Sequence, residues 1–193
     1  MARWTAWKMP GAANESGTSD FEFFNTEHLT EYDSLYSVGF FIPHSGATTI
    51  KGYYYEKTLY YNSTVLGTAK SLSTEIPKGI LSQHPYTTFT QGSNSDLWGA
   101  TLTPATANDE SFGYALKFRR VADADEDISH RLVFTDYGFE IPTGETILGV
   151  QTSMSGLTAY YNAEKYGVFY KHPLMRICYT GDPGNAMWLG ITF

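Results

Sequence analysis

Three aspartates spaced two residues apart are the first candidate for chemistry in this sequence. Asp123, Asp125 and Asp127 match the start of a helix–loop–helix calcium loop. The sixth position of such a loop needs a glycine and is Ile128, and the twelfth needs a glutamate and is Phe134. The spacing therefore excludes an EF-hand. It predicts a solvated hairpin tip, with a looser cation site as the alternative.

Histidine and cysteine side chains form no catalytic or metal-binding pattern. The histidines are scattered singly without the spacing of a zinc site, and the one cysteine lies in the apolar run LMRICY, which is typical of a core position. A nucleophile elbow, a phosphate-binding glycine loop and a dinucleotide fingerprint do not occur. Among 20 acidic residues, nothing distinguishes a catalytic pair. We therefore predict a protein that is not an enzyme, with no catalytic residue, cofactor or metal. The side chains considered are His28, His44, His84, His130, His172 and Cys178.

Composition narrows the range of partners. The chain has 193 residues and a formal charge of −7, and Arg119-Arg120 is its one adjacent basic pair. This balance argues against nucleic acid, because phosphate contacts need clustered Lys and Arg. No apolar run reaches the roughly 18 residues of a membrane span, and MARWTAWKMPG lacks the apolar centre of a secretory signal. We expect a soluble protein made in a cytoplasm, with neither nucleic acid nor membrane as partner.

Aromatic residues are the candidates for binding. A tyrosine-rich stretch over residues 53–61 suggests a carbohydrate platform, but alternation along a strand sends neighbouring side chains to opposite faces. Trp4 and Trp7 are predicted to anchor an N-terminal arm, residues 1–20, onto the core or a neighbouring subunit, because an indole buries a large area. Stacking on a ligand is the alternative for this pair.

The end of the sequence, residues 181–193, is an apolar tail that follows the turn-forming stretch Asp182–Asn185. A bare apolar strand would be prone to aggregate, so the tail is predicted to cover its own sandwich or to add to a neighbouring subunit. We favour the neighbour. The predicted assembly interface consists of Trp4, Trp7, Met187, Trp188, Leu189, Ile191 and Phe193.

Short strands are the elements that would position these residues. In residues 96–119, two strand-like runs, 97–102 and 112–118, flank a turn-rich connector, and Gly99 and Gly113 indicate a bulge or a close backbone approach. Further on, KYGVFYKHPLMRICYT predicts two strands. No amphipathic helical period exceeds two turns. The pattern predicts an all-β protein, an antiparallel β-sandwich of jelly-roll type with roughly ten to twelve short strands and little helix.

One motif occurs twice. GFFIP at residues 39–43 returns as GFEIP at residues 138–142, each followed by a turn and a second apolar run. In the first copy, a strand is predicted to end at Ile42, with Pro43 closing it. Two copies fit either a duplicated module or one sandwich that uses the same strand–turn–strand device twice. We favour the single sandwich, because the similarity between the copies is short.

The runs YSVGFFIPHSGATTIKG, LGTAKSL and YTTFTQGSNSDLWGATLTPATANDESFGYAL, with a late RICYT strand, resemble a known module. It is a jelly-roll β-sandwich found in virion proteins of tailed bacteriophages and their prophages. The resemblance covers residues 30–120 and the final strand at 174–180. It implies one jelly-roll domain over residues 21–180. Residues 121–173 stand where the family has only a short connection, as an insertion or a partial repeat.

The resemblance implies a non-enzymatic structural role in a virion, most simply a capsid decoration (cement) subunit that binds and stabilises the shell. The expected partners are the major capsid protein or other virion subunits and further copies of the chain, with a trimer as one option. The alternative is a tail or head-fibre accessory protein that binds carbohydrate or a host surface. The chain would be made in the host bacterial cytoplasm and located in the virion. The family supplies no catalytic residues.

Overall fold

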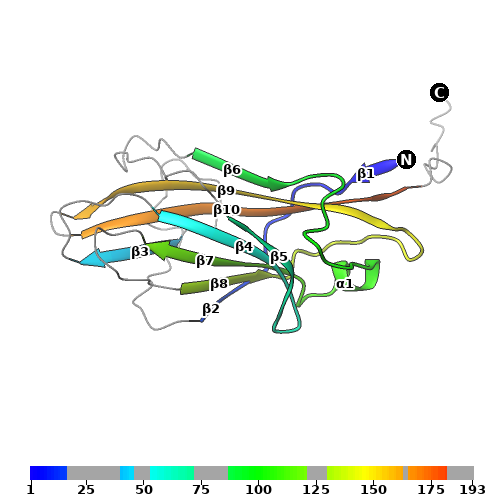
Figure 1. The fold of residues 1–193 in the computed structure, drawn as a ribbon, viewed down its shortest axis with the longest axis horizontal. Coiled ribbons are helices and arrows are strands. Elements are labelled where there is room, and N and C mark those ends of the chain that lie inside the picture. Colours follow the sequence, from blue (N-terminus) through cyan, green and yellow to red (C-terminus); the bar gives the residue numbers. More distant parts are fainter. Residues whose placement is uncertain (17–39, 46–52, 72–86, 121–129, 163–164, 182–193) are drawn as a thin grey trace, which may run out of the picture.

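The protein is built from two antiparallel sheets of five strands each, called sheet A and sheet B (Figure 1). The computed structural model describes residues 1–16, 40–45, 53–71, 87–120, 130–162 and 165–181. Sheet A has the order β1 (Ala2–Trp4), β10 (Lys165–Thr180), β9 (Ile147–Asn162), β6 (Thr87–Gly92), and β3 (Phe40–Ser45) also pairs with β10. Sheet B has the order β2 (Ala12–Ser16), β8 (His130–Thr135), β7 (Gly113–Arg120), β4 (Tyr53–Tyr61), β5 (Thr64–Ser71).

The core lies between the two sheets. Alternate residues along each strand point inward, as the two-residue period of a strand requires. Inward side chains that are fully buried include Leu59, Tyr114, Leu116, Leu132 and Phe134 from sheet B, and Val150, Met154, Met175 and Ile177 from sheet A. The prediction of an all-β antiparallel sandwich is therefore confirmed, while the jelly-roll order of strands stays a prediction. In the part of the chain that the structure describes, no helix is long and apolar enough to cross a membrane.

Strands β9 and β10 are the longest elements, with 16 residues each, and they pair along the length of the domain (Figure 1). The two strands predicted for residues 165–180 are therefore one strand. The register shifts between Lys171 and Leu174, where His172 has a φ of 54°. This irregularity interrupts the alternation of side chains, which is why the sequence suggested a break.

The first strand predicted in residues 96–119 is wrong. Residues 93–103 form a loop that leads into α1 (Pro104–Asn108), the one helix among the described residues. Within the loop, Trp98 has a φ of 57° and Gly99 a φ of 70°, values that an extended strand does not contain. The second prediction, a strand after the connector, is confirmed as β7. Gly113 at its start lies so close to the Phe134 carbonyl oxygen that a Cβ atom would clash with it.

The two copies of the repeated motif differ in local structure. In the first copy, β3 continues through Pro43, which is in register with Gly167 of β10, so the predicted strand end at Ile42 is wrong. Among the described strands β3 pairs only with β10, and an edge strand tolerates the missing N–H of proline. In the second copy, the backbone of Ile141 lies in a loop instead. Asn108 holds this loop: its Nδ2 donates to the Ile141 carbonyl at 2.8 Å, and its Oδ1 accepts from the Ile141 N–H at 2.8 Å.

The segment predicted as an N-terminal arm contributes a strand to each sheet. Strand β1 pairs with β10 in sheet A, and β2 pairs with β8 in sheet B. Between them, the Thr5 N–H donates to the Ile177 carbonyl at 2.9 Å, and Lys8 forms an isolated bridge with Met175. The first 16 residues therefore lie on the sandwich itself and cross from one sheet to the other.

A tight two-residue turn joins β4 to β5, and it gives a first prediction. Asn62 and Ser63 have φ values of 46° and 62°, the left-handed region that a type I′ turn requires at both positions. Glycine is favoured at the second position, so Ser63→Gly should raise the free energy of unfolding by about 0.5–1 kcal/mol. Urea denaturation measures the change. Ser71→Gly, at the exposed end of β5 where φ is not positive, is the control and should not stabilise the protein.

Candidate functional site

The most distinctive surface feature is a guanidinium group that packs against two indole rings. Cζ of Arg176 lies 4.3 Å from the ring centroid of Trp4 and 4.4 Å from that of Trp7. Arg176 comes from β10, whereas Trp4 ends β1 and Trp7 lies in the segment that follows it. All three side chains are half-buried. Cation–π contacts at such distances are favourable by about 0.5–2 kcal/mol each. We call Trp4, Trp7 and Arg176 the tryptophan–arginine cluster.

The alternation of β10 places this cluster on the outer face of sheet A. Met175 and Ile177 point into the core, so Arg176 between them points outward. Its cross-strand neighbour on β9 is Gln151. Oε1 of Gln151 accepts from Nε of Arg176 at 2.8 Å and from Nη2 at 2.6 Å, and Nε2 of Gln151 donates to the Gly92 carbonyl of β6 at 3.3 Å. A row of contacts across three strands therefore fixes the plane of the guanidinium.

Cys178 lies on the same face, in register with Trp4, and it is fully buried. Burial raises the pKa of its thiol, and the positive charge of Arg176 lowers it by a smaller amount, so the net shift is upward. A thiol with a raised pKa is a poor nucleophile at neutral pH. Cys178 is buried, as predicted, but it is not part of the core cluster between the sheets, and the alternation of β10 places it on the outer face of sheet A.

The first residues of the chain and the end of β10 meet beside the tryptophan–arginine cluster. Ala2 is in register with Thr180, the Gly181 N–H donates to the Met1 carbonyl at 2.8 Å, and the Met1 amino group donates to the Gly181 carbonyl at 3.1 Å. Gly181 is buried. We call this region, which ends at Met1 and Gly181, the terminal corner of sheet A.

A row of hydroxyl groups continues the outer face of sheet A toward β6. Thr88 and Ser155 are in register and their hydroxyl oxygens are 2.9 Å apart, and Oγ1 of Thr90 donates to Oγ of Ser153 at 3.4 Å. Thr88 and Thr90 are exposed. This small polar surface is a place where sugar hydroxyls could bind, and it adjoins the amide of Gln151.

A lysine lies in the core between the sheets. Lys57 of β4 is fully buried, its Nζ donates to Oγ1 of Thr152 on β9 at 3.2 Å, and Nζ lies 5.4 Å from the ring centroid of Tyr114. Burial lowers the pKa of Lys57 to about 7, because a low-dielectric interior disfavours the charged form. Such a lysine can be a catalytic group, but its bond to Thr152 links sheet A to sheet B across the core. We assign it a structural role.

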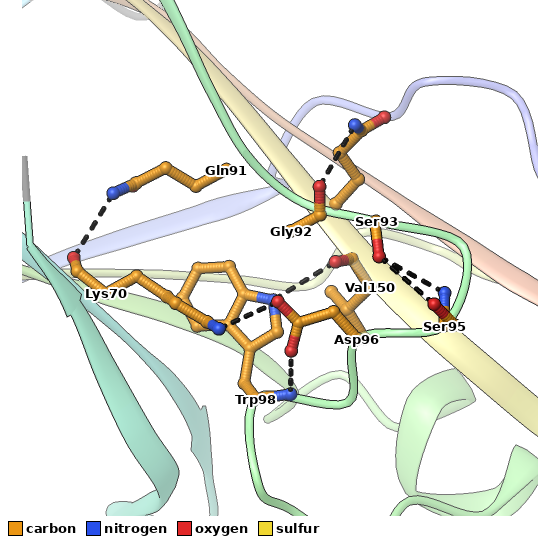
Figure 2. A network of polar contacts seen from close by, with 9 residues as sticks. Lys70, Gln91, Gly92, Ser93, Ser95, Asp96, Trp98 and Val150 are labelled. Atoms are coloured by element: carbon orange, nitrogen blue, oxygen red, sulfur yellow. Dashed lines mark hydrogen bonds and ion pairs between the residues drawn. The ribbon is translucent and has the colours of Figure 1, made fainter.

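A salt bridge anchors the loop of residues 93–103 (Figure 2). Nζ of Lys70 lies 2.7 Å from Oδ2 of Asp96, whose Oδ1 accepts from the backbone N–H of Trp98 at 2.8 Å. Partial burial raises the pKa of Asp96, but the hydrogen bonds from Lys70 and Trp98 outweigh it and leave the pKa below its ordinary value. The buried indole of Trp98 donates from Nε1 to the Val150 carbonyl at 3.1 Å. These contacts fasten the loop over β5 and β9.

Metal binding finds no support in the part of the chain that the structure describes. No group of three His, Cys, Asp or Glu side chains there could hold an ion. The aspartates of the acidic stretch, Asp123, Asp125 and Asp127, lie outside the described residues. Strands β7 and β8 on either side of the stretch do pair as neighbours in an antiparallel manner. The predictions of a solvated tip and of a looser cation site therefore both remain predictions.

The structure brings together two residues of the predicted assembly interface. Trp4 and Trp7 lie side by side around Arg176. The other members, Met187, Trp188, Leu189, Ile191 and Phe193, lie outside the described residues. Sequence reasoning missed Arg176 and Gln151. Alternation in LMRICY could have placed Arg176 on the outer face, but the register of residue 4 with residue 178 has no sequence signal.

Comparison with models of protein families, with characterised proteins and with solved structures gives no significant match. The protein is therefore classified by its fold: it is an all-β protein with two antiparallel sheets packed face to face.

Proposed function

We propose that this protein is a non-enzymatic structural subunit of a tailed-bacteriophage virion, and specifically a decoration protein that binds and stabilises the capsid shell. The basis for the virion assignment is the resemblance of the motifs in residues 30–120 to a module of phage virion proteins. The two-sheet architecture is compatible with that module. The observation that supports a binding role is the terminal corner of sheet A.

The terminal corner joins the two segments that the sequence predicts to mediate assembly. The N-terminal tryptophans lie on β1 and just after it, and the apolar tail begins where β10 ends at Thr180. Because Ala2 is in register with Thr180, both segments start from one place on sheet A. Tryptophan and arginine are also the residues most enriched at energetically important positions of protein interfaces. We assign the shell-binding surface to this corner.

A direct test asks whether the protein is part of a particle. Particles purified from the bacterium that carries the gene should contain the chain by mass spectrometry, and purified protein should co-sediment with particles that lack it. Trp7→Ala should weaken this binding by about tenfold or more, the usual loss when an interface anchor is truncated. Val65→Ala removes an exposed apolar side chain from β5 in sheet B and is the matched control. A chain absent from particles that also fails to co-sediment with them contradicts the proposal.

A second candidate is an accessory subunit that binds carbohydrate. The observation that favours it is the row of hydroxyl groups on Thr88, Thr90, Ser153 and Ser155, which shares the outer face of sheet A with Gln151 and the two indoles, since glycan sites combine hydroxyl or amide groups with aromatic faces. Glycan-array binding that is lost in a Thr88→Val/Thr90→Val variant, together with normal binding of Trp7→Ala to particles, would support this candidate over the first.

A further inference from the structure

The guanidinium of Arg176 lies at the surface, yet several contacts fix its orientation. The guanidinium contacts the rings of both Trp4 and Trp7, and one edge is occupied because Nε and Nη2 both donate to Gln151. Gln151 is itself fixed by its bond to Gly92. A guanidinium has a second edge, formed by Nη1 and the other N–H of Nη2. This second edge is therefore presented in one orientation.

The charge of Arg176 is not balanced by a carboxylate among the residues that the structure describes. Its hydrogen bonds there go to a neutral amide oxygen, and no salt bridge to it is formed in those parts of the chain. The two indoles exclude water where they lie against the cation, and this strengthens any charge–charge contact at its edge. A planar guanidinium edge matches the two oxygens of a carboxylate.

We propose that the second edge of Arg176 binds the carboxylate of an aspartate or glutamate on a partner protein, with Trp4 and Trp7 on either side of the contact. This inference rests on the proposed function and names the chemistry by which the terminal corner recognises its partner. A protein carboxylate fits better than a free anion, because the half-buried indoles offer apolar area that only a surface can cover. The chain carries a net charge of −7, so the contact gives orientation and specificity rather than long-range attraction.

The first arm of the test examines the site alone, with acetate as the probe. Sodium acetate replaces sodium chloride at constant ionic strength, while nitrogen–proton spectra follow Arg176 Nε–H and the indole N–H groups of Trp4 and Trp7. Saturable shifts are expected for these three signals. In Arg176→Gln the two indole signals should stop responding, and in Arg176→Lys, which keeps the charge without the fork, the response should be weaker. Equal spectra in acetate and chloride overturn the proposal.

The second arm measures co-sedimentation with particles. Arg176→Gln should lower the affinity by about tenfold or more, as expected for the loss of a charge-assisted pair. Arg176→Lys should fall between that variant and the native protein. Lys8→Gln removes an equal charge from an exposed site close to the cluster and should bind like the native protein. Melting temperatures of all variants identify any that fail to fold. If Arg176→Gln does not fold, the affinity of Arg176→Lys is compared with that of the native protein instead.

The outcomes separate this inference from the proposed function. If the native protein does not bind particles, the proposed function fails and the partner assigned to Arg176 fails with it, whatever acetate does. If the native protein binds and both Arg176 variants bind equally well, the function stands and the carboxylate contact is wrong. Binding that falls in the Arg176 variants but not in Lys8→Gln, with acetate-dependent shifts of both indoles, supports the proposal.

Discussion

Replacing Lys57 with methionine is expected to raise the free energy of unfolding by about 2–4 kcal/mol at pH 7, because an amine leaves the core and a side chain of similar length fills its place. The lowering of the Lys57 pKa from 10.5 to about 7 corresponds to about 4–5 kcal/mol of differential stability between the two protonation states. Methionine cannot donate to Thr152, and the loss of this bond offsets about 1 kcal/mol of the gain.

The pH dependence of the free energy of unfolding has a sign that follows from the lowered pKa of Lys57. Between pH 7 and pH 10.5 the unfolded chain holds a proton on Lys57 that the folded chain releases, so the stability of the native protein rises with pH across this window. Below pH 7 both states are protonated and the penalty is constant and complete. The advantage of Lys57→Met should therefore be largest below pH 7 and should shrink as the pH approaches 10.5.

Urea denaturation of both proteins from pH 6 to pH 10 measures this effect. The double variant Lys57→Met/Thr152→Val removes the hydroxyl that the single variant leaves without its lysine partner, and it should be more stable still. Lys8→Met changes the charge equally at an exposed position and is the control. If Lys57→Met is destabilised at every pH, the amine contributes more through its contacts than it costs through burial, and our account of the core is wrong.

The second large effect is expected at Trp98. Trp98→Ala should lower the free energy of unfolding by about 3–5 kcal/mol, because the indole is 1% exposed and its removal leaves a large cavity. The substitution also removes the bond from Nε1 to the Val150 carbonyl, while the φ of 57° strains alanine as it already strains tryptophan. Trp98→Gly would relieve the strain but not fill the cavity, so it should be destabilised to a similar or slightly smaller extent.

Thermal and urea unfolding of three variants distinguish a packing tryptophan from a binding one. Trp98→Ala should lose stability, whereas Trp7→Ala, at a half-buried outer site, should lose much less stability and instead lose binding to particles. Trp98→Phe keeps most of the packing and should fall between Trp98→Ala and the native protein. Equal destabilisation by Trp98→Ala and Trp7→Ala would mean that the tryptophan–arginine cluster is part of the folding core.

The sequence predicted secondary structure best where side chains alternate between a buried and a solvent-exposed face. Tyr114, Leu116 and Phe118 follow a two-residue period, and β7 is a strand that buries the first two. The period fails at residues 97–102, since an apolar run that contains Leu97, Trp98 and Leu102 resembles a strand even when it folds as a loop. The deciding feature there is the carboxylate of Asp96, which accepts from the Trp98 N–H and bends the backbone.

The candidate site could be predicted only in part, for a related reason. Local patterns predicted that Trp4 and Trp7 anchor their segment onto the core or a neighbouring subunit, because an indole buries a large area. They could not indicate Arg176, which is distant in the sequence and meets them only through the pairing of β1 with β10. Likewise, Lys57 follows a run of tyrosines and a glutamate, and nothing in that run distinguishes its buried amine from an exposed one. Long-range register, which the sequence does not encode locally, places both cations.

The most direct test of the central claim is an electron cryomicroscopy reconstruction of phage particles purified from the bacterium that carries the gene. We expect the two-sheet domain to sit on the outside of the capsid shell, with the terminal corner of sheet A turned toward a neighbouring subunit and an acidic side chain of that subunit at Arg176. Density for the domain with the terminal corner facing solvent, or a shell with no such domain on it, would contradict the account.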